Sequence, residues 1–231
     1  MTEPGLRQLT FDLPVRPALG REDYFVSPAN ALAVAALERW RDWPSGRMVL
    51  SGPESAGKTH LAHVWAAETG AVIATAAELT EADLPALAER AAVVEDIDRI
   101  AGRQATETAL FHLLNMAAEA GGPLLLTGSG RPAHWPFALA DLASRVQAMP
   151  VASLDAMDDA LLSALLAKLF ADRQLAVSPG VISWMVRRIE RSFAGAQRAV
   201  VALDARALAE GRAITRQLAA EVLARAGDWS T

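Results

Sequence analysis

The chain has 231 residues, 52% of them hydrophobic, with a net charge of −5 and a pI near 5.4. This suits one large domain or a domain with a small appendage, and the acidic balance argues against broad non-specific nucleic-acid binding. The absence of cysteine excludes disulfides, thiol catalysis and cysteine-based zinc sites. No apolar run approaches the ~18 residues that span a bilayer and no basic-then-apolar leader begins the chain, so we expect a cytoplasmic protein without membrane contact.

The first 23 residues contain three prolines and two glycines and show no helical period. They predict an extended arm over 1–23. Ser27 and Pro28 then combine a good helix N-cap with a proline suited to the first helical turn. A helix is expected from this pair to about Trp40.

Short apolar runs alternate with helical segments over the following hundred residues. Strands are expected over 47–51, 71–75, 91–98 and 123–129. Helices are expected between them over 59–68, 81–90 and 104–120. Such alternation is typical of a parallel sheet built from crossover units.

From about Leu154 the pattern becomes helical throughout. Helices are expected over 155–171, 178–190, 194–209 and 215–226. We therefore predict an α/β nucleotide-binding domain over 24–152, with helices flanking a parallel sheet, followed by a small all-helical lid domain over 153–231.

The octet after the first strand matches the phosphate-loop pattern G-x-x-x-x-G-K-[ST] in full. It consists of Gly52, Pro53, Glu54, Ser55, Ala56, Gly57, Lys58 and Thr59. The two glycines permit tight turns and close backbone approach to a triphosphate. Lys58 supplies charge for the β- and γ-phosphates, and the Thr59 hydroxyl is a Mg²⁺ ligand. The next helix, in which His60 lies near the nucleotide, adds its N-terminal dipole to the anion site.

The third strand is apolar and ends in two carboxylates, Glu95 and Asp96, the arrangement of a Walker B strand. We expect one acid, Glu95, at the metal and the other, Asp96, orienting the attacking water. Aspartate is usual at the first position, so Glu95 predicts at most weak ATPase activity of the chain's own. At the end of the fourth strand, Thr127 or Ser129 is placed to sense the γ-phosphate. A solvated strand edge is the alternative for the two acids, and an ordinary turn residue at the end of a strand is the alternative for Thr127 and Ser129.

Two arginines are candidates for contacting phosphate. Arg145 lies just before the domain boundary and is placed to reach a nucleotide held by a neighbouring subunit, as an arginine finger does. Arg191 lies in the helical lid, where an arginine facing the cleft would couple nucleotide state to lid angle. A surface ion pair is the alternative for Arg145, and three further arginines close to Arg191 compete for its role.

The phosphate loop, the Walker B strand and the two arginines, in this order, resemble the AAA+ family. Within that family they resemble the DnaA branch, which includes the short regulatory Hda members. The resemblance covers about residues 20–226. Arg145 in Leu-Ala-Ser-Arg matches the branch's arginine-finger segment, and Arg191 in Arg-Ser-Phe-Ala-Gly-Ala matches its sensor-2 segment. Residues 127–132 resemble the sensor-1 turn, with Ser-Gly where the branch has Asp. The segment that packs on adenine is matched by Tyr24, Phe25, Val26 and Asn30. The resemblance thus implies ADP or ATP, with Mg²⁺, as the ligand.

The arm carries a short motif, Gln8-Leu9-Thr10-Phe11-Asp12-Leu13. It resembles the peptide with which Hda and many polymerase subunits bind the sliding clamp, the beta subunit of DNA polymerase III. Gln8 offers hydrogen bonds, and Leu9, Phe11 and Leu13 are apolar anchors for a hydrophobic groove. An arm that packs on its own domain is the alternative.

The resemblance implies a regulator of chromosome replication initiation. A DnaA-type initiator would continue past the lid into a helix-turn-helix domain, and the sequence ends at Thr231, so we expect no sequence-specific DNA binding. In this interpretation the arm tethers the chain to the DNA-loaded clamp, and bound ADP or ATP holds the lid. Arg145 then enters the ATP site of an adjacent DnaA and speeds hydrolysis, which prevents re-initiation.

Two other functions stay open, and a homo-oligomer in which Arg145 faces a like subunit is a further possibility. The first is a stand-alone P-loop ATPase that hydrolyses its own ATP. The second is a DnaA-related helicase loader or DNA-binding adaptor, which the acidic pI disfavours.

Overall fold

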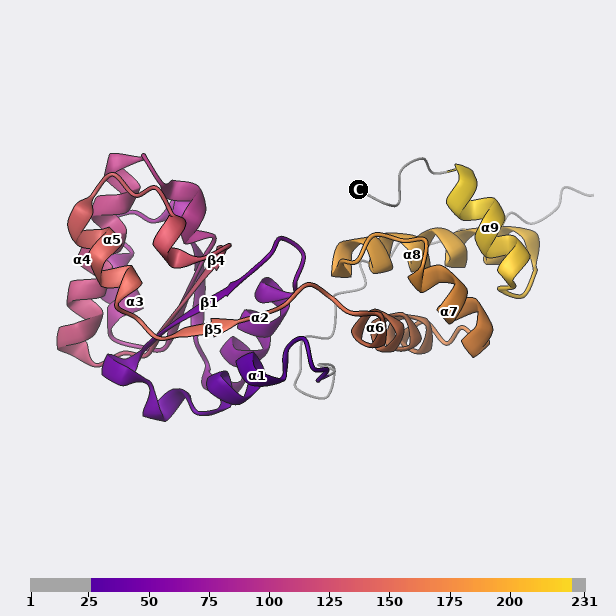
Figure 1. Cartoon of the computed structure of the whole chain (residues 1–231), viewed down its shortest axis with the longest axis horizontal. Coiled ribbons are helices and arrows are strands. Elements are labelled where there is room, and N and C mark those ends of the chain that lie inside the picture. Colours follow the sequence, from indigo (N-terminus) through magenta and orange to yellow (C-terminus); the bar gives the residue numbers. More distant parts are fainter. Residues whose placement is uncertain (1–25, 226–231) are drawn as a thin grey trace, which may run out of the picture.

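The structure is a computed structural model that describes residues 26–225. The described residues form an α/β part and an all-helical part, joined by the chain that follows the last strand (Figure 1). The arm of residues 1–23, with its predicted clamp-binding motif, lies outside the described residues, as do Tyr24 and Phe25.

The α/β part is built on one sheet of five parallel strands in the order β2-β3-β4-β1-β5. The strands are β1 (Arg47–Gly52), β2 (Val72–Thr75), β3 (Ala92–Glu95), β4 (Leu124–Ser129) and β5 (Val151–Ser153). All six residues of β1 are buried, and the strand pairs with β4 on one side and with β5 on the other. Its near-continuous apolar sequence fits a strand covered on both faces.

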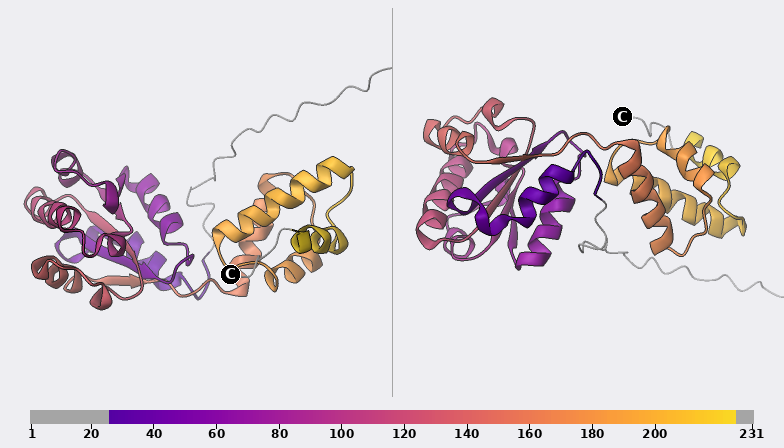
Figure 2. Two further views of the ribbon diagram at one scale, coloured as in Figure 1. Left: turned by 90° about the horizontal axis from the view of Figure 1, so that it is seen from above. Right: turned by 60° about the horizontal axis from the view of Figure 1, so that its bottom comes forward.

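Helices cover both faces of this sheet (Figure 2). α1 (Ala31–Glu38) and α2 (Lys58–Thr69) pack on one face, and α3 (Leu84–Ala88), α4 (Gln104–Ala120) and α5 (Ala140–Gln147) on the other. Both faces need covering because alternate side chains of each strand point to opposite faces of the sheet. Val49 and Leu126 join the core under α4, whereas Leu50 and Leu125 join the core under α2.

The all-helical part has a hydrophobic core of its own. It contains α6 (Asp159–Asp172), α7 (Pro179–Val186), α8 (Phe193–Glu210) and α9 (Arg216–Arg225). Its core runs from Met157 to Val222 and includes the fully buried Leu162, Met185 and Leu203. Two helix starts are capped by side chains: Asp158 accepts a hydrogen bond from the backbone N–H of Leu161 at 2.7 Å, and Ser192 from that of Gly195 at 2.8 Å.

Short 3₁₀ turns link several of these elements. They lie at Trp40–Asp42, Pro44–Gly46, Ala76–Glu78, Ile97–Ile100 and Pro132–His134. Within the described residues no helix is long and apolar enough to cross a membrane.

The observed elements differ from the sequence predictions in several places. The third strand ends at Glu95 instead of 98, because Asp96 takes a left-handed backbone with φ of 59°. The first helix begins at Ala31, since Ser27 to Asn30 form a turn in which the Ser27 N–H donates to Asn30 Oδ1 at 2.8 Å. The helix expected from 155 begins at Asp159. Strand β5 and helix α5 were not predicted.

Strand β5 continues past the domain boundary that the sequence predicts between residues 152 and 153. Ser153 still pairs with Ser51, and the Leu154 N–H donates to the Ser51 carbonyl at 2.7 Å. The sheet therefore holds the chain up to Leu154, and the connection to the helical part is confined to the few residues before α6.

Glu107 on α4 is fully buried and organises the approach to α5. Its carboxylate accepts backbone N–H bonds from Gly102 at 2.6 Å, Ala138 at 3.0 Å and Leu139 at 2.7 Å. A buried carboxylate is stable only when its oxygens are satisfied, and here three N–H donors do this. Leu139 immediately precedes α5, so Glu107 fixes where that helix starts.

We predict that Glu107→Ala lowers the free energy of unfolding by about 3 kcal/mol or more, because it removes the buried carboxylate that accepts three backbone N–H bonds. Urea denaturation measures the change. Glu119→Ala, at an exposed position on the same helix, is the matched control and should stay within about 0.5 kcal/mol of the parent. Equal effects of the two substitutions would contradict the role assigned to Glu107.

Candidate nucleotide-binding site

The phosphate loop leaves the carboxyl end of β1 and enters α2, and its backbone explains the residues it uses. Gly57 has φ of +93°, a conformation that side chains disfavour. Ser55 is also left-handed, with φ of 62°. Gly52 is required for a different reason: a Cβ there would lie 2.8 Å from the carbonyl oxygen of Leu154. The close approach at Gly52 is thus to the chain after β5.

Lys58 is only 7% exposed, at the first position of α2. Its ammonium donates to the carbonyls of Gly52 at 3.0 Å and Pro53 at 2.7 Å, so it lies over the end of β1. Burial lowers the pKa of Lys58, while the nearby carboxylates of Asp98, Asp96 and Glu54 act to raise it. An added phosphate would act in the same direction as these carboxylates.

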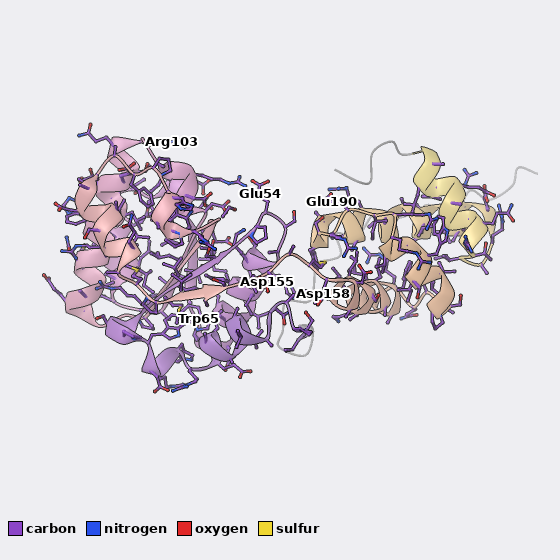
Figure 3. All side chains as sticks on the ribbon, in the orientation of Figure 1. Glu54, Trp65, Arg103, Asp155, Asp158 and Glu190 are labelled. Atoms are coloured by element: carbon purple, nitrogen blue, oxygen red, sulfur yellow. The ribbon has the colours of Figure 1, made fainter. Side chains whose placement is uncertain are left out.

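A cavity of about 480 Å³ opens above the loop. The phosphate loop, the ends of β3 and β4 and the start of α8 all line it, through Glu54, Ser55, Gly57, Lys58, Thr59, His60, His63, Asp96, Arg99, Ser129, Ser192, Phe193 and Ala194. In Figure 3 the labelled Glu54 and Glu190 mark the loop and the facing end of the helical part. Seven residues predicted for the nucleotide therefore share one cavity: Glu54, Ser55, Gly57, Lys58, Thr59, His60 and Asp96.

The acidic end of β3 is fixed by its neighbour strand. The Asp96 N–H donates to Thr127 Oγ1 at 3.1 Å, and Thr127 is 1% exposed. Thr127 therefore holds the turn at Asp96, and of the two candidate sensor residues it is Ser129 that lines the cavity. The Asp96 carboxylate lies 3.5 Å from Arg99 Nε.

Glu95 lies at the end of β3 but does not line the cavity. Its Oε2 is 3.6 Å from His63 Nε2, and its Oε1 is buried without a hydrogen-bond partner. Of the two acids, Asp96 is thus the one presented to the space above the phosphate loop. The cavity carries the Thr59 hydroxyl and the Asp96 carboxylate, oxygens of the kind that Mg²⁺ takes beside phosphates. The described residues contain no group of three or more His, Cys, Asp or Glu side chains that could hold a metal ion.

The helical part touches the phosphate loop at two points. The rings of His60 and Phe193 stack with centroids 5.5 Å apart, which joins the start of α2 to the start of α8. Glu190 forms hydrogen bonds with Ser192, Arg198 and the loop residue Ser55, and these lower its pKa. Both contacts link the helical part directly to the segment that would cradle phosphate.

Three predicted nucleotide contacts lie away from the cavity. Arg191 is paired with Asp159 and lies 3.4 Å from the carbonyl of Met157, so the structure does not place it in the cleft as expected. Val26 lines a separate cavity of about 140 Å³ between α1 and α2. Asn30 is buried in the turn before α1.

Residues that sequence reasoning missed take part in the cavity. Arg99 is the main one, and its Nη2 lies 3.9 Å from Glu54. Its position three residues after Asp96, in a helical turn, is the signal that could have found it. Phe193 and Ala194 line the cavity, where Arg191 was expected. Their position there becomes clear only from the observed start of α8 at Phe193.

Arg145 lies at the opposite end of the sheet from the phosphate loop. It shares a cavity with Arg47, the first residue of β1, whereas Gly52 is the last residue of that strand. Five residue steps along a strand separate the two ends by roughly 16 Å. Its guanidinium lies over the ring of Phe111, 4.9 Å from the centroid, and the residue is exposed. It therefore cannot reach the chain's own phosphate loop.

Comparison with known proteins agrees with this architecture. No family model matches the chain. Over 232 residues it is 27% identical to the chromosomal replication initiator protein DnaA of Caulobacter vibrioides, covering 88% of this chain and 47% of that protein. The chain thus spans about half the length of the curated relatives it matches.

Solved structures show the same fold. Domain III of the replication initiation protein DnaA from Thermotoga maritima matches with a TM-score of 0.75 at 19% identity, over 92% of this chain and 98% of that one. AMPPCP-bound DnaA from Aquifex aeolicus matches with a TM-score of 0.69 at 15% identity, over 91% of this chain and 68% of that one. The five-stranded parallel sheet with flanking helices is therefore the fold of DnaA domain III. The chain is homologous to DnaA.

We predict that nucleotide affinity falls as pH rises through the lowered pKa of Lys58. Bound phosphate favours the charged ammonium, so the pKa of Lys58 is higher in the complex than in the free protein. Affinity is full below the free-protein pKa and declines above it, by up to about one decade per pH unit. Titration of ADP at several alkaline pH values measures this slope. In Lys58→Met the slope should be absent, and an unchanged slope would contradict the assignment.

Proposed function

We propose that this protein regulates replication initiation by binding an adenine nucleotide and the DNA-loaded sliding clamp and by stimulating hydrolysis of ATP bound to DnaA. The position of Arg145 carries the proposal. It is an exposed arginine, remote from its own phosphate loop, on a chain homologous to DnaA. An arginine in this position acts in trans, on a nucleotide held by another subunit, and the homology makes DnaA the natural partner.

The chain's own site favours holding nucleotide over hydrolysing it. Glu95 is turned to His63, so one of the two Walker B acids is diverted from the cavity. Asp96, Lys58 and Thr59 remain there and suffice for a phosphate–Mg²⁺ complex. Nucleotide bound in this cavity would contact both the phosphate loop and the start of α8, and in this way it would set the angle between the two parts.

Hydrolysis of ATP pre-bound to DnaA, measured in the presence of clamp-loaded DNA, tests the proposal. The wild-type chain should accelerate conversion to ADP, and Arg145→Ala should lose about 10³-fold or more of that stimulation, because it removes the transition-state cation. Arg206→Ala on α8, where Arg206 pairs with Glu210, is the matched control and should retain it. A wild-type chain without effect on DnaA-bound ATP would rule the proposal out.

The clamp tether is tested separately, because its residues lie outside the described part of the chain. Replacing Gln8 and Phe11 together by alanine removes the hydrogen-bonding group and one apolar anchor of the motif. Clamp binding by the purified protein should be lost, while nucleotide affinity stays at the wild-type value. Clamp binding at wild-type strength in the double variant would show that the tether lies elsewhere.

A stand-alone ATPase is the second candidate, and the placement of Asp96 in the same cavity as Lys58 and Thr59 favours it. Turnover of ATP by the isolated chain, abolished by Asp96→Asn, would support this function. Turnover that survives Asp96→Asn, or none at all, would leave the regulator as the better explanation.

A further inference from the structure

Arg47 lines the same cavity as Arg145 and has no role in the proposed function. Arg47 is only 8% exposed, yet its Nε and Nη2 atoms are buried without hydrogen-bond partners. Among the described residues no acidic side chain pairs with it. An unpaired buried guanidinium is costly to a fold, so this residue calls for an explanation beyond packing.

We propose that Arg47 and Arg145 together form a binding pocket for a phosphate group, at the end of the sheet opposite the phosphate loop. Both arginines line a cavity of about 210 Å³ bounded by the start of β1 and the segment after α5. Ser45, also on its wall, brings a hydroxyl donor from a left-handed backbone position with φ of 54°. Such a conformation is uncommon for a residue other than glycine.

Charge balance selects phosphate over a single carboxylate. The cavity holds two guanidinium groups and no acidic side chain. The carboxyl end of α5 contributes only about half a negative charge. A phosphate carries up to two charges and three acceptor oxygens, and the planar fork of a guanidinium matches it bidentately.

The arrangement leaves the arginines available for such a ligand. Arg145 is held by the face of Phe111, and a contact with the ring face leaves the N–H edge of the guanidinium unoccupied. Burial, and then the charge of Arg145, lower the pKa of Arg47. The two cations thus repel each other, and an anion between them relieves that repulsion.

The phosphate has two sources with the same chemistry. One is free inorganic phosphate. The other is the terminal phosphate of a nucleotide held by an adjacent subunit, and this source rests on the proposed function. In the second case Arg47 is a further cationic residue for the hydrolysis that Arg145 stimulates.

Calorimetric titration with inorganic phosphate tests the free source, with the protein saturated with ADP and Mg²⁺ so that its own phosphate loop is filled. One phosphate should bind per chain, and Arg47→Met and Arg145→Met should each weaken binding about tenfold or more. Arg47→Lys, which keeps the charge without the fork, should be intermediate. Arg206→Met should bind as wild type does. Arg47→Met removes an unpaired charge, so its thermal midpoint without phosphate should be no lower than that of wild type.

The DnaA hydrolysis assay tests the second source with the same variants. Slower stimulation by Arg47→Met, restored in part by Arg47→Lys, assigns the pocket to the partner's nucleotide. Phosphate binding that depends on Arg47, together with unchanged stimulation, assigns it to free phosphate. If Arg47→Met alters neither measurement, the pocket is not a phosphate site. If the wild-type chain fails to stimulate DnaA, the proposed function fails, and the calorimetry alone decides on the pocket.

Discussion

The parallel pairing of β1 between β4 and β5 is the constraint on which the rest of the structure depends. A strand buried on both faces along all six residues can present function only at its two ends. Its carboxyl end carries the phosphate loop, and because the neighbours run parallel, Asp96 and Ser129 arrive at the same edge. Its amino end carries Arg47, beside Arg145. The sheet thus separates a nucleotide site from a cationic face within one small domain.

The sequence predicts the features that depend on local chemistry. The phosphate loop is contiguous, and its role follows from eight residues and the strand and helix that flank them. Helix α4 was predicted over 104–120, where it is found, because its apolar residues recur at helical spacing. The structure shows that Gly121 ends it in a left-handed conformation with φ of 79°. The parallel sheet with flanking helices was confirmed by the structure and by its likeness to DnaA domain III.

The features that depend on tertiary placement were not predictable in this way. Sequence position put Arg191 in the lid, but only the packing of α6 against α8 shows that Asp159 takes its guanidinium. From the sequence alone Arg99 would be taken for a surface residue. In the structure the turn after Asp96 places it at the cavity. β5 is three residues long, too short for a periodic signal, and its identity comes from pairing with β1.

The two contacts between the helical part and the phosphate loop explain how nucleotide could influence geometry without a sensor arginine. Ser55 and His60 belong to the segment that would wrap phosphate, and their partners Glu190 and Phe193 flank the start of α8. A phosphate that shifts the loop would alter both contacts at once. The connection before α6 is short, and the hydrogen bond from the Leu154 N–H to the Ser51 carbonyl holds its start to β1.

The face that carries Arg145 is held differently. Glu107 fixes the chain entering α5 and Phe111 holds the Arg145 guanidinium, and the two lie four residues apart on α4, on one face of that helix. Both supports come from the first two turns of α4, the longest helix of the described α/β part, which packs on the sheet core. A functional group mounted on a packed helix keeps its geometry better than one on a loop. Nucleotide bound in the proposed site would therefore have little effect on the position of Arg145, and under the proposed function its control would act through the orientation of the helical part.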